Sequence, residues 1–530
     1  MAVFVGSNSD DSRIRSNRVG FAASTSNPGS PAEGDAYYNS TDNKLNVYDG
    51  SDWAAVGAGG GTIELVASGT LANGQTVIIQ SDGTVKAVSG ESQSVGSAAV
   101  YESANVSGYL AATFDSTNGK VVIAYMDGGN SNHGTAVVGT VSGTSISFGT
   151  PVVFAAAQTE YISATFDSTN GKVVITYNDD GNFGSGTAIV GTVSGTSISF
   201  GSEAVFNSGQ SVSTSTFDST NGKVIIVFRD GANSNYGTAV VGTISGTSIS
   251  YGSEAVFESA RIDHASAAFD SSNGKVVIAY RDYGNSNYGT AVVGTVSGTS
   301  ISFGTPVVFN SGGNTVYTST IFDSTNNKIV IAYRDGGNSN YGAAIVGTVS
   351  GTSISFGSAV VFESATSNYI SAAYDSNAGK VLIAYQDNDN SQYGTFIVGT
   401  VSGTSISFDS PVVYESANAS PNAAVFDSSN NKVAISYADA GNSNYGTSIV
   451  VQIANTNLTS TNFLGFSDAA YSDGATATIQ VAGSVDDAQS GLTTAKTHYV
   501  QNDGTLSTTA GSPSVEAGTA VSATQIIVKG

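Results

Sequence analysis

The sequence predicts an all-β protein: a seven-bladed β-propeller of four-stranded antiparallel blades with small β-rich flanking modules. An aromatic-Asp-Ser triplet recurs seven times, at spacings of 51 to 53 residues. Each repeat holds four short apolar segments separated by Gly- and Asn-rich turns, and four antiparallel strands in roughly 40 to 50 residues are typical of a propeller blade. Helix formers are scarce beside Ser, Thr, Gly and Val, which favours strands throughout.

The repeat predicts the order of the strands. The triplets begin at Phe114, Phe166, Phe217, Phe269, Phe322, Tyr374 and Phe426. In the first repeat we expect strands a to d at 108–114, 120–126, 135–141 and 145–154. The turn Asn118-Gly119 between strands a and b suits a tight hairpin that needs positive φ. Strand a is rich in small residues, as expected near a crowded axis. Strand d carries Pro151, Pro306 and Pro411, which suits an outer edge where no ladder donor is needed.

The first and last parts of the repeat region complement each other. Residues 88–101 have the spacing of 141–154, a c–d turn followed by strand d, although no strands a to c precede them. The seventh repeat departs from the pattern after strand c, at Gln452. We therefore expect an N-terminal strand to complete the last blade and close a propeller that spans residues 91–462.

Three other segments flank the propeller. We expect residues 1–56 to form a separate N-terminal module, residues 57–90 a linker and β-hairpin module, and residues 463–530 a C-terminal β module. The Gly-rich stretch 57–61 is typical of a flexible linker. The turn at 80–84 is similar to the turn at 501–505, so we expect residues 62–90 and 463–530 to pack together.

Composition excludes several classes of function. The formal net charge of −23 repels phosphate backbones, so no nucleic-acid partner is expected. The chain has no Cys, which excludes disulfides and thiol chemistry. No apolar window is long enough for membrane insertion, and the N-terminus lacks the apolar stretch of a signal peptide. Release by lysis would fit such a chain.

In a four-stranded blade the b–c and d–a connections lie on one face, where we expect ligand-binding residues. The b–c loops offer arginine and tyrosine at recurring positions, and the d–a connections offer variable aromatic residues; the candidates are Arg229, Arg281, Arg334, Tyr236, Tyr288, Tyr341, Tyr161, Tyr317 and His264. Tyrosine stacks on sugar C–H faces, and Arg pairs with acidic sugars. The alternative is that the repeated loops are scaffold, with Asp and Asn forming Asx turns. The variable d–a connections are therefore the better candidates for specificity.

The sequence contains few residue patterns typical of a catalytic site, a cofactor site or a metal site. Most loops supply one Asp, fewer carboxylates than a calcium site uses, although 387–390 is richer and leaves calcium open. His133, His264 and His498 are scattered and predict no catalytic triad. No catalytic residue, metal site or cofactor is predicted.

The a–b turns repeat an Asp and a Lys, as in Asp115 and Lys120. We expect solvated hairpin turns there, with weak cross-turn ion pairs. The alternative is a face that docks onto another protein.

Two short segments carry a resemblance to a known family. The stretch 34–56, GDAYYNSTDNKLNVYDGSDWAAV, resembles an element of tail-fibre and other virion proteins of tailed bacteriophages. The ending 515–530, VEAGTAVSATQIIVKG, is similar to C-termini of structural proteins in marine and cyanobacterial phages. The resemblance implies a virion appendage that binds other virion proteins through its N-terminal module and forms a homo-oligomer, a trimer by analogy.

Within that resemblance three functions stay open. The propeller could present a surface to a host receptor or glycan. It could instead be purely structural and bind only other virion proteins. The third possibility is a polysaccharide-degrading propeller enzyme.

Overall fold

The computed structural model describes residues 61–106, 108–511 and 513–529, together with short segments between residues 14 and 56. Two compact units make up the chain, Ser92–Ala454 and a second unit of Met1–Glu91 with Asn455–Gly530. The described residues are almost all in strands and short turns. No helix among them is long and apolar enough to cross a membrane. Most of the predicted linker at 57–61 falls outside the described residues.

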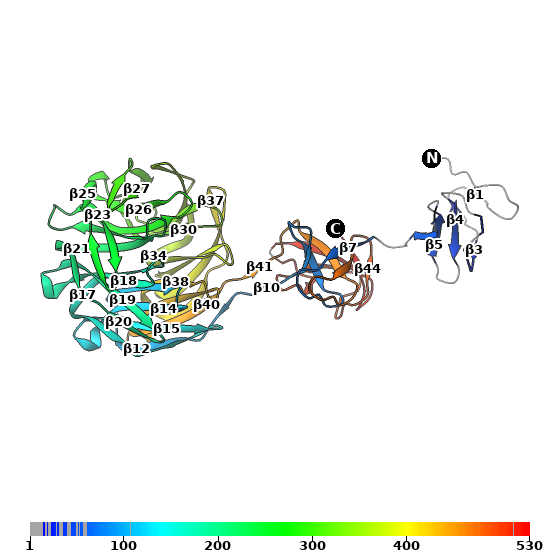
Figure 1. The fold of residues 1–530 in the computed structure, drawn as a ribbon, viewed down its shortest axis with the longest axis horizontal. Helices are drawn as coiled ribbons and strands as arrows, with labels where there is room; N and C mark the ends of the chain where they lie inside the picture. The colour runs from blue at the N-terminus through cyan, green and yellow to red at the C-terminus, as the bar shows by residue number, and fades with distance from the viewer. Residues whose placement is uncertain are drawn as a thin grey trace. The chain divides into compact units, whose positions relative to one another are not determined.

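In the unit Ser92–Ala454 each repeat forms an antiparallel meander (Figure 1). The first strand of each meander ends in the Asp of the triplet; these strands are β13 (Leu110–Asp115), β17 (Val152–Asp167), β21 (Ala204–Asp218), β25 (Ala255–Asp270), β30 (Thr315–Asp323), β34 (Val360–Asp375) and β38 (Val412–Asp427). The second strands are β14 (Lys120–Asp127), β18 (Lys172–Asp179), β22 (Lys223–Asp230), β26 (Lys275–Asp282), β31 (Lys328–Asp335), β35 (Lys380–Asp387) and β39 (Lys432–Asp439).

The third strands are β15 (His133–Ser142), β19 (Ser185–Ser194), β23 (Tyr236–Ser245), β27 (Tyr288–Ser297), β32 (Tyr341–Ser350), β36 (Tyr393–Ser402) and β40 (Tyr445–Gln452). Short outer strands follow six of them: β16 (Ser145–Phe148), β20 (Ser197–Phe200), β24 (Ser248–Tyr251), β28 (Ser300–Phe303), β33 (Ser353–Phe356) and β37 (Ser405–Phe408). Four three-residue 3-10 helices, η1 (Gly128–Asn130), η2 (Asp180–Asn182), η3 (Tyr283–Asn285) and η4 (Ala440–Asn442), lie between second and third strands.

The first strands of most repeats also pair with the third strand of the preceding repeat. The N-terminal half of β17 pairs with β15, and its C-terminal half pairs with β18. The predicted strand d at 145–154 is therefore wrong as a single strand, because it is interrupted after Phe148 and resumes at Val152. Pro151 lies in this interruption rather than in a strand. The predicted d–a loops are likewise continuous strand, except where β12 (Ala99–Asn105) ends before β13 and where β29 (Val307–Asn310) ends before β30.

The first and last segments of this unit pair with each other. Strands β11 (Ser94–Val95) and β12 (Ala99–Asn105) pair with β40, where the other repeats place their outer strand. This pairing confirms the expected N-terminal contribution to the seventh sheet. Each first strand contacts the first strand of the next repeat, and β13 contacts β38. The unit begins at Ser92 and ends at Ala454, short of the expected boundary at 462.

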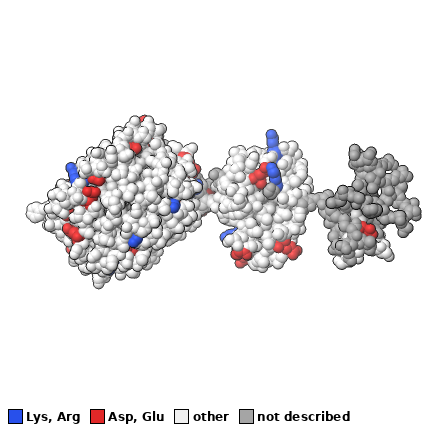
Figure 2. Space-filling model, turned by 90° about the horizontal axis from the view of Figure 1, so that it is seen from above, with Lys and Arg blue, Asp and Glu red and all other residues white. Residues whose placement is uncertain are grey.

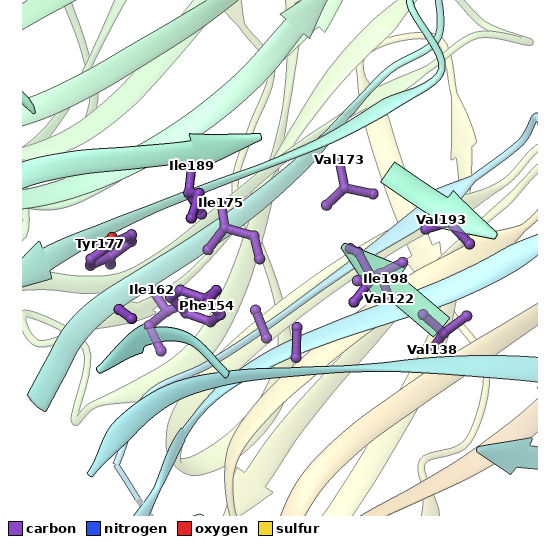
Figure 3. Packing of buried hydrophobic residues seen from close by; sticks show 13 residues of the cluster. Val122, Val138, Phe154, Ile162, Val173, Ile175, Tyr177, Ile189, Val193 and Ile198 are labelled. Carbon is purple, nitrogen blue, oxygen red and sulfur yellow. The ribbon is translucent and has the colours of Figure 1, made fainter. Parts of the chain in front are cut away.

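Apolar side chains on both faces of each sheet form cores between neighbouring sheets. Val122 and Val138 of one sheet pack with Val173 and Ile175 of the next, and all four are almost fully buried (Figure 3). Burying one such side chain contributes about 1.5–3 kcal/mol. The alternation expected of a one-sided sheet is absent because both faces are covered.

The turns between first and second strands differ from the expected solvated ion pairs. Asp115 is fully buried, and its Oδ1 accepts hydrogen bonds from the backbone N–H groups of Thr117 and Asn118, both at 3.0 Å. Lys120 donates from Nζ to Thr140 Oγ1 at 2.8 Å rather than to Asp115. The expectation of a weak Asp–Lys pair is wrong because the carboxylate is consumed in capping its own turn.

Within its described residues, the second unit contains two five-stranded sheets, one four-stranded sheet and two two-stranded pairings. One five-stranded sheet has the order β7 (Thr62–Val66), β43 (Thr476–Gln480), β42 (Phe463–Ser467), β8 (Thr76–Ile79) and β9 (Val85–Ala87). The other has the order β44 (Val485–Asp486), β48 (Ile526–Val528), β47 (Val515–Ala520), β45 (Thr497–Val500) and β46 (Leu506–Ser507). The first sheet joins residues 62–90 to residues 463–480. Strand β10 (Gly90–Glu91) pairs with β41 (Asn455–Thr456).

Short strands are also described in the N-terminal segment. A four-stranded sheet has the order β3 (Ala23–Ser24), β4 (Ala36–Asn39), β5 (Lys44–Tyr48) and β6 (Trp53–Val56). A hairpin pairs β1 (Ile14–Arg15) with β2 (Arg18–Val19). In this sheet β4 pairs antiparallel with β5, and β5 pairs antiparallel with β6.

Candidate functional site: aromatic residues of the first strands and neighbouring arginines

Four of the first strands carry an aromatic or imidazole residue with a left-handed backbone. Tyr161, His264, Tyr317 and Tyr369 have φ values of 49°, 49°, 52° and 48°. Each lies in a β-bulge, where the register with the second strand shifts. Positive φ is rare for bulky residues and costs about 1–3 kcal/mol, and such strain concentrates at functional sites.

These side chains contact one another between neighbouring repeats. The ring centroids of His264 and Tyr317 are 5.3 Å apart, and those of Tyr317 and Tyr369 are 5.2 Å apart. Tyr161 contacts Tyr109 of the first repeat at 4.7 Å. Tyr369 remains 37% exposed although it contacts another ring. We call His264, Tyr317 and Tyr369 the aromatic triplet, and Tyr109 with Tyr161 the tyrosine pair.

The two groups are separated along the chain by the third repeat, which has no bulge between its first and second strands. Strand β21 has 15 residues where β17 and β25 have 16, and Val212 pairs directly with Arg229. The missing residue accounts for the single spacing of 51 between triplets. In the seventh repeat Pro421 occupies the bulge.

The arginines of Ser92–Ala454, four in all, gather beside the aromatic triplet. Asp263, which precedes His264, pairs with Arg229, with Arg261 at 2.8 Å and with Arg281 at 3.2 Å. The side chains of Asp263 and Arg281 are each 12% exposed. Burial opposes ionisation of Asp263, but Arg229, Tyr283 and Arg261 together lower its pKa below the usual value. Charged side chains are few and scattered on the face seen in Figure 2.

Tyr283, the first residue of η3, lies between two of these arginines. The guanidinium carbons of Arg261 and Arg281 are each 4.4 Å from the centre of its ring. Arg281 also donates to the Tyr283 hydroxyl and, at 3.0 Å, to Asn314 Oδ1 of the next repeat. Stacking and hydrogen bonding together fix the guanidinium planes.

Arg334 is placed differently from the other three. Its guanidinium lies 5.0 Å from the centre of the Tyr317 ring and donates to Asn368 Oδ1. Burial lowers the pKa of Arg334, with a further lowering from Arg281 and an opposing effect from Tyr317. Burial and the neighbouring Arg281 also lower the pKa of His264 to about 4, so this imidazole is neutral at neutral pH.

The structure brings together five of the nine side chains predicted to bind a ligand: Arg229, Arg281, Arg334, His264 and Tyr317. Tyr161 lies in the separate tyrosine pair. The remaining three candidates are Tyr236, Tyr288 and Tyr341, the first residues of the third strands β23, β27 and β32. Each is half-buried and pairs across the strands with the recurrent Asp of its loop.

The recurrent Asp residues cap these loops. Asp282 Oδ1, for example, accepts a hydrogen bond from the backbone N–H of Asn285 at 3.1 Å. The geometry agrees with the interpretation of the repeated loops as scaffold. No group of three or more metal-binding side chains is arranged to hold a metal in the part of the chain that the structure describes.

Arg261 and Asp263 lie in one of the variable d–a connections expected to set specificity, whereas Tyr283, Tyr109 and Tyr369 were not predicted from the sequence. A positional signal for two of them was present. In five of seven repeats the fifth residue before the triplet's aromatic is Tyr or His: Tyr109, Tyr161, His264, Tyr317 and Tyr369. The recurrence marks the bulge, but nothing in the sequence shows that these rings meet.

Comparisons with known proteins bear on the fold. No protein-family model and no curated protein matches the chain. The BP39L lectin from Burkholderia pseudomallei is similar in structure, with a TM-score of 0.50 and 10% identity over 68% of this chain and 99% of that one.

Two further solved structures match with lower scores. The SapL1 lectin in complex with alpha methyl fucoside has a TM-score of 0.38 at 13% identity, over 59% of this chain and 98% of its own. A leech intramolecular trans-sialidase has a TM-score of 0.37 at 9% identity, over 68% of this chain and 70% of its own. At these identities the comparisons concern the fold alone, and the chain shares an antiparallel β fold with the first lectin.

Proposed function

We propose that the seven repeats of Ser92–Ala454 are the blades of one closed β-propeller. The same strand pairing recurs in every repeat, and β12 takes the place of the outer strand in the seventh sheet. The contact between β13 and β38 supports closure. The similarity to a lectin over nearly all of that lectin's length supports the same fold.

We propose that this propeller binds glycans through the aromatic triplet. The observation that carries the proposal is the meeting of His264, Tyr317 and Tyr369 at strained bulge positions beside partly buried arginines. Aromatic faces stack on the C–H surfaces of sugar rings, and Arg and Asn donate or accept hydrogen bonds with hydroxyl groups. A purely structural sheet would not need bulky residues with positive φ at this place.

The proposed activity is binding without catalysis. His264 is neutral at neutral pH, and Asp263 is held as a carboxylate by its pairing with three arginines. We expect no new reducing ends when the protein is incubated with any polysaccharide that it binds. Their steady release would contradict this part of the proposal.

The biological setting that we propose is a phage virion. The support is the resemblance of residues 34–56 and 515–530 to virion proteins. The N-terminal module would attach to other virion proteins, and the propeller would face the host surface. Cryo-microscopy of intact particles with the N-terminus labelled tests this setting, and absence of the chain from purified particles would contradict it.

The glycan proposal is tested by glycan-array binding of the full chain and of Tyr369→Ala. Tyr374→Ala is a matched control, because Tyr374 is the same residue type on the same strand, five residues away. Loss of one stacking ring is expected to weaken binding about tenfold. Equal losses in both variants, or no bound glycan with the wild-type protein, would contradict the proposal.

A further inference from the structure

We propose that the aromatic triplet with Arg334 binds an acidic sugar, whose carboxylate pairs with Arg334. This inference rests on the proposed glycan-binding function and names the substrate class of that site. It is carried by the contrast between Arg334 and the other three arginines.

Three of the four arginines already share a carboxylate. Arg229, Arg261 and Arg281 all pair with Asp263. Within the described residues, Arg334 forms no such pair and donates only to the neutral amide oxygen of Asn368. A half-buried guanidinium without a counter-charge is costly, and an anion that binds it recovers part of that cost.

The nearest carboxylate along the chain is engaged elsewhere. Asp335 follows Arg334, but its Oδ1 accepts hydrogen bonds from the backbone N–H of Gly337 at 3.1 Å and from Asn310 Nδ2 at 3.0 Å. Successive side chains on a strand also point to opposite faces. Asp335 is therefore committed to its own loop, and Arg334 keeps its charge available to a ligand.

The charge of Arg334 lies beside the rings of the aromatic triplet. Its guanidinium lies against the ring of Tyr317, and its partner Asn368 immediately precedes Tyr369. A sugar ring on Tyr369 thus has a cation nearby, supplied by β31 of the preceding repeat. His264 is neutral and adds no charge at neutral pH, and Asp263 is already shared among three arginines.

The tyrosine pair supplies a contrast within the same protein. Asn178 precedes the recurrent Asp of β18, at the place that Arg334 holds in β31. The residue before Tyr161 is Glu160, which accepts a hydrogen bond from Gln158 at 3.1 Å. Rings near a carboxylate and without arginine suit a neutral sugar, so the preference for an acidic sugar is expected only at the aromatic triplet.

The test is calorimetry of the full chain with an oligogalacturonate and with the same oligosaccharide after its carboxyl groups are reduced to alcohols. We expect the acidic form to bind at least tenfold more tightly and to weaken with added salt. Arg334→Gln should weaken the acidic form about tenfold and leave the neutral form unchanged. Lys328→Gln is the matched control, since it removes the same charge from the opposite end of β31.

Each outcome separates the two proposals. If neither oligosaccharide nor any arrayed glycan binds the wild-type protein, the proposed function fails. If the neutral form binds as tightly as the acidic one, or Arg334→Gln binds both as the wild type does, only the acidic-sugar inference fails. If a sulfated, carboxyl-reduced oligosaccharide bound as tightly as the carboxylate form, Arg334 would recognise anions in general, and the specific assignment to a carboxylate would fail. Arg334→Lys should restore part of the affinity, and unchanged thermal unfolding of Arg334→Gln would exclude misfolding.

Discussion

Replacing Asp263 by Asn removes the one negative charge that three arginines share while keeping the size of the side chain. Arg229, Arg261 and Arg281 come from two second strands and one first strand, so the carboxylate links two neighbouring repeats. The substitution leaves the guanidinium groups of Arg229 and Arg281 buried without a counter-charge. We expect the unit Ser92–Ala454 to lose stability as a result.

The magnitude follows from burial. Exposed ion pairs contribute about 0–1 kcal/mol, whereas removing one partner of a buried pair costs about 3–5 kcal/mol. The side chains of Asp263, Arg229 and Arg281 are only 12%, 15% and 12% exposed, so water screens their charges little. We therefore expect a loss of about 3 kcal/mol. With an unfolding entropy of about 2.1 cal/mol/K per residue, this loss lowers the Tm of a unit of this length by about 4 °C.

The assay is urea unfolding of the wild type, Asp263→Asn, Arg229→Gln and the double variant at pH 7. Because the three arginines depend on one carboxylate, the double variant should be more stable than additivity predicts, by about 1 kcal/mol or more. The folded-state pKa of Asp263 is lowered, so its contribution is present above the unfolded pKa and is lost as pH falls through the folded one. The difference between wild type and Asp263→Asn should thus close in acid. A loss below about 1 kcal/mol, or one unchanged at low pH, would refute the reasoning.

Three further predictions concern single residues and the same unfolding assay. His264 has a pKa of about 4 in the folded state, so the protein should lose up to about 3 kcal/mol of folding stability as pH falls from 6.5 to 4. His264→Gln should flatten that decline in stability, and an unchanged slope would contradict the assignment. Asp323 is fully buried, and its Oδ1 accepts a hydrogen bond from the backbone N–H of Thr325 at 3.0 Å. Asp323→Ala should therefore lower the free energy of unfolding by about 2 kcal/mol, and an unchanged stability would show that the turn forms without this cap. A Cβ on Gly342 would lie 2.4 Å from the Phe362 ring, so Gly342→Val should cost about 2 kcal/mol or more, and a stable variant would disprove the tight contact.

The repeat and the closing strand could be predicted from the sequence because both depend on local patterns. The triplets fix the period, Gly turns mark the hairpins, and residues 88–101 have the spacing of a c–d unit without its partner strands. Such patterns are short-range, and β12 pairs with β40 as they predict.

The site could be predicted only in part, because its contacts join different repeats. Arg229 and Arg334 were identified by recurrence, but their partners Asp263 and Asn368 lie 34 residues further along the chain. The apparent d–a loops also hid the bulges, since strong pairing on both sides makes β25 and β34 continuous strands. Only the three-dimensional structure shows that bulge residues of adjacent strands meet.

The central claim is that sugars bind at the aromatic triplet. A crystal structure of the full chain soaked with the tightest-binding acidic oligosaccharide from the array tests it most directly. We predict a sugar ring stacked on Tyr317 or Tyr369 with its carboxylate against Arg334. A sugar bound instead over the loops at Tyr236, Tyr288 or Tyr341, with the aromatic triplet empty, would contradict the account.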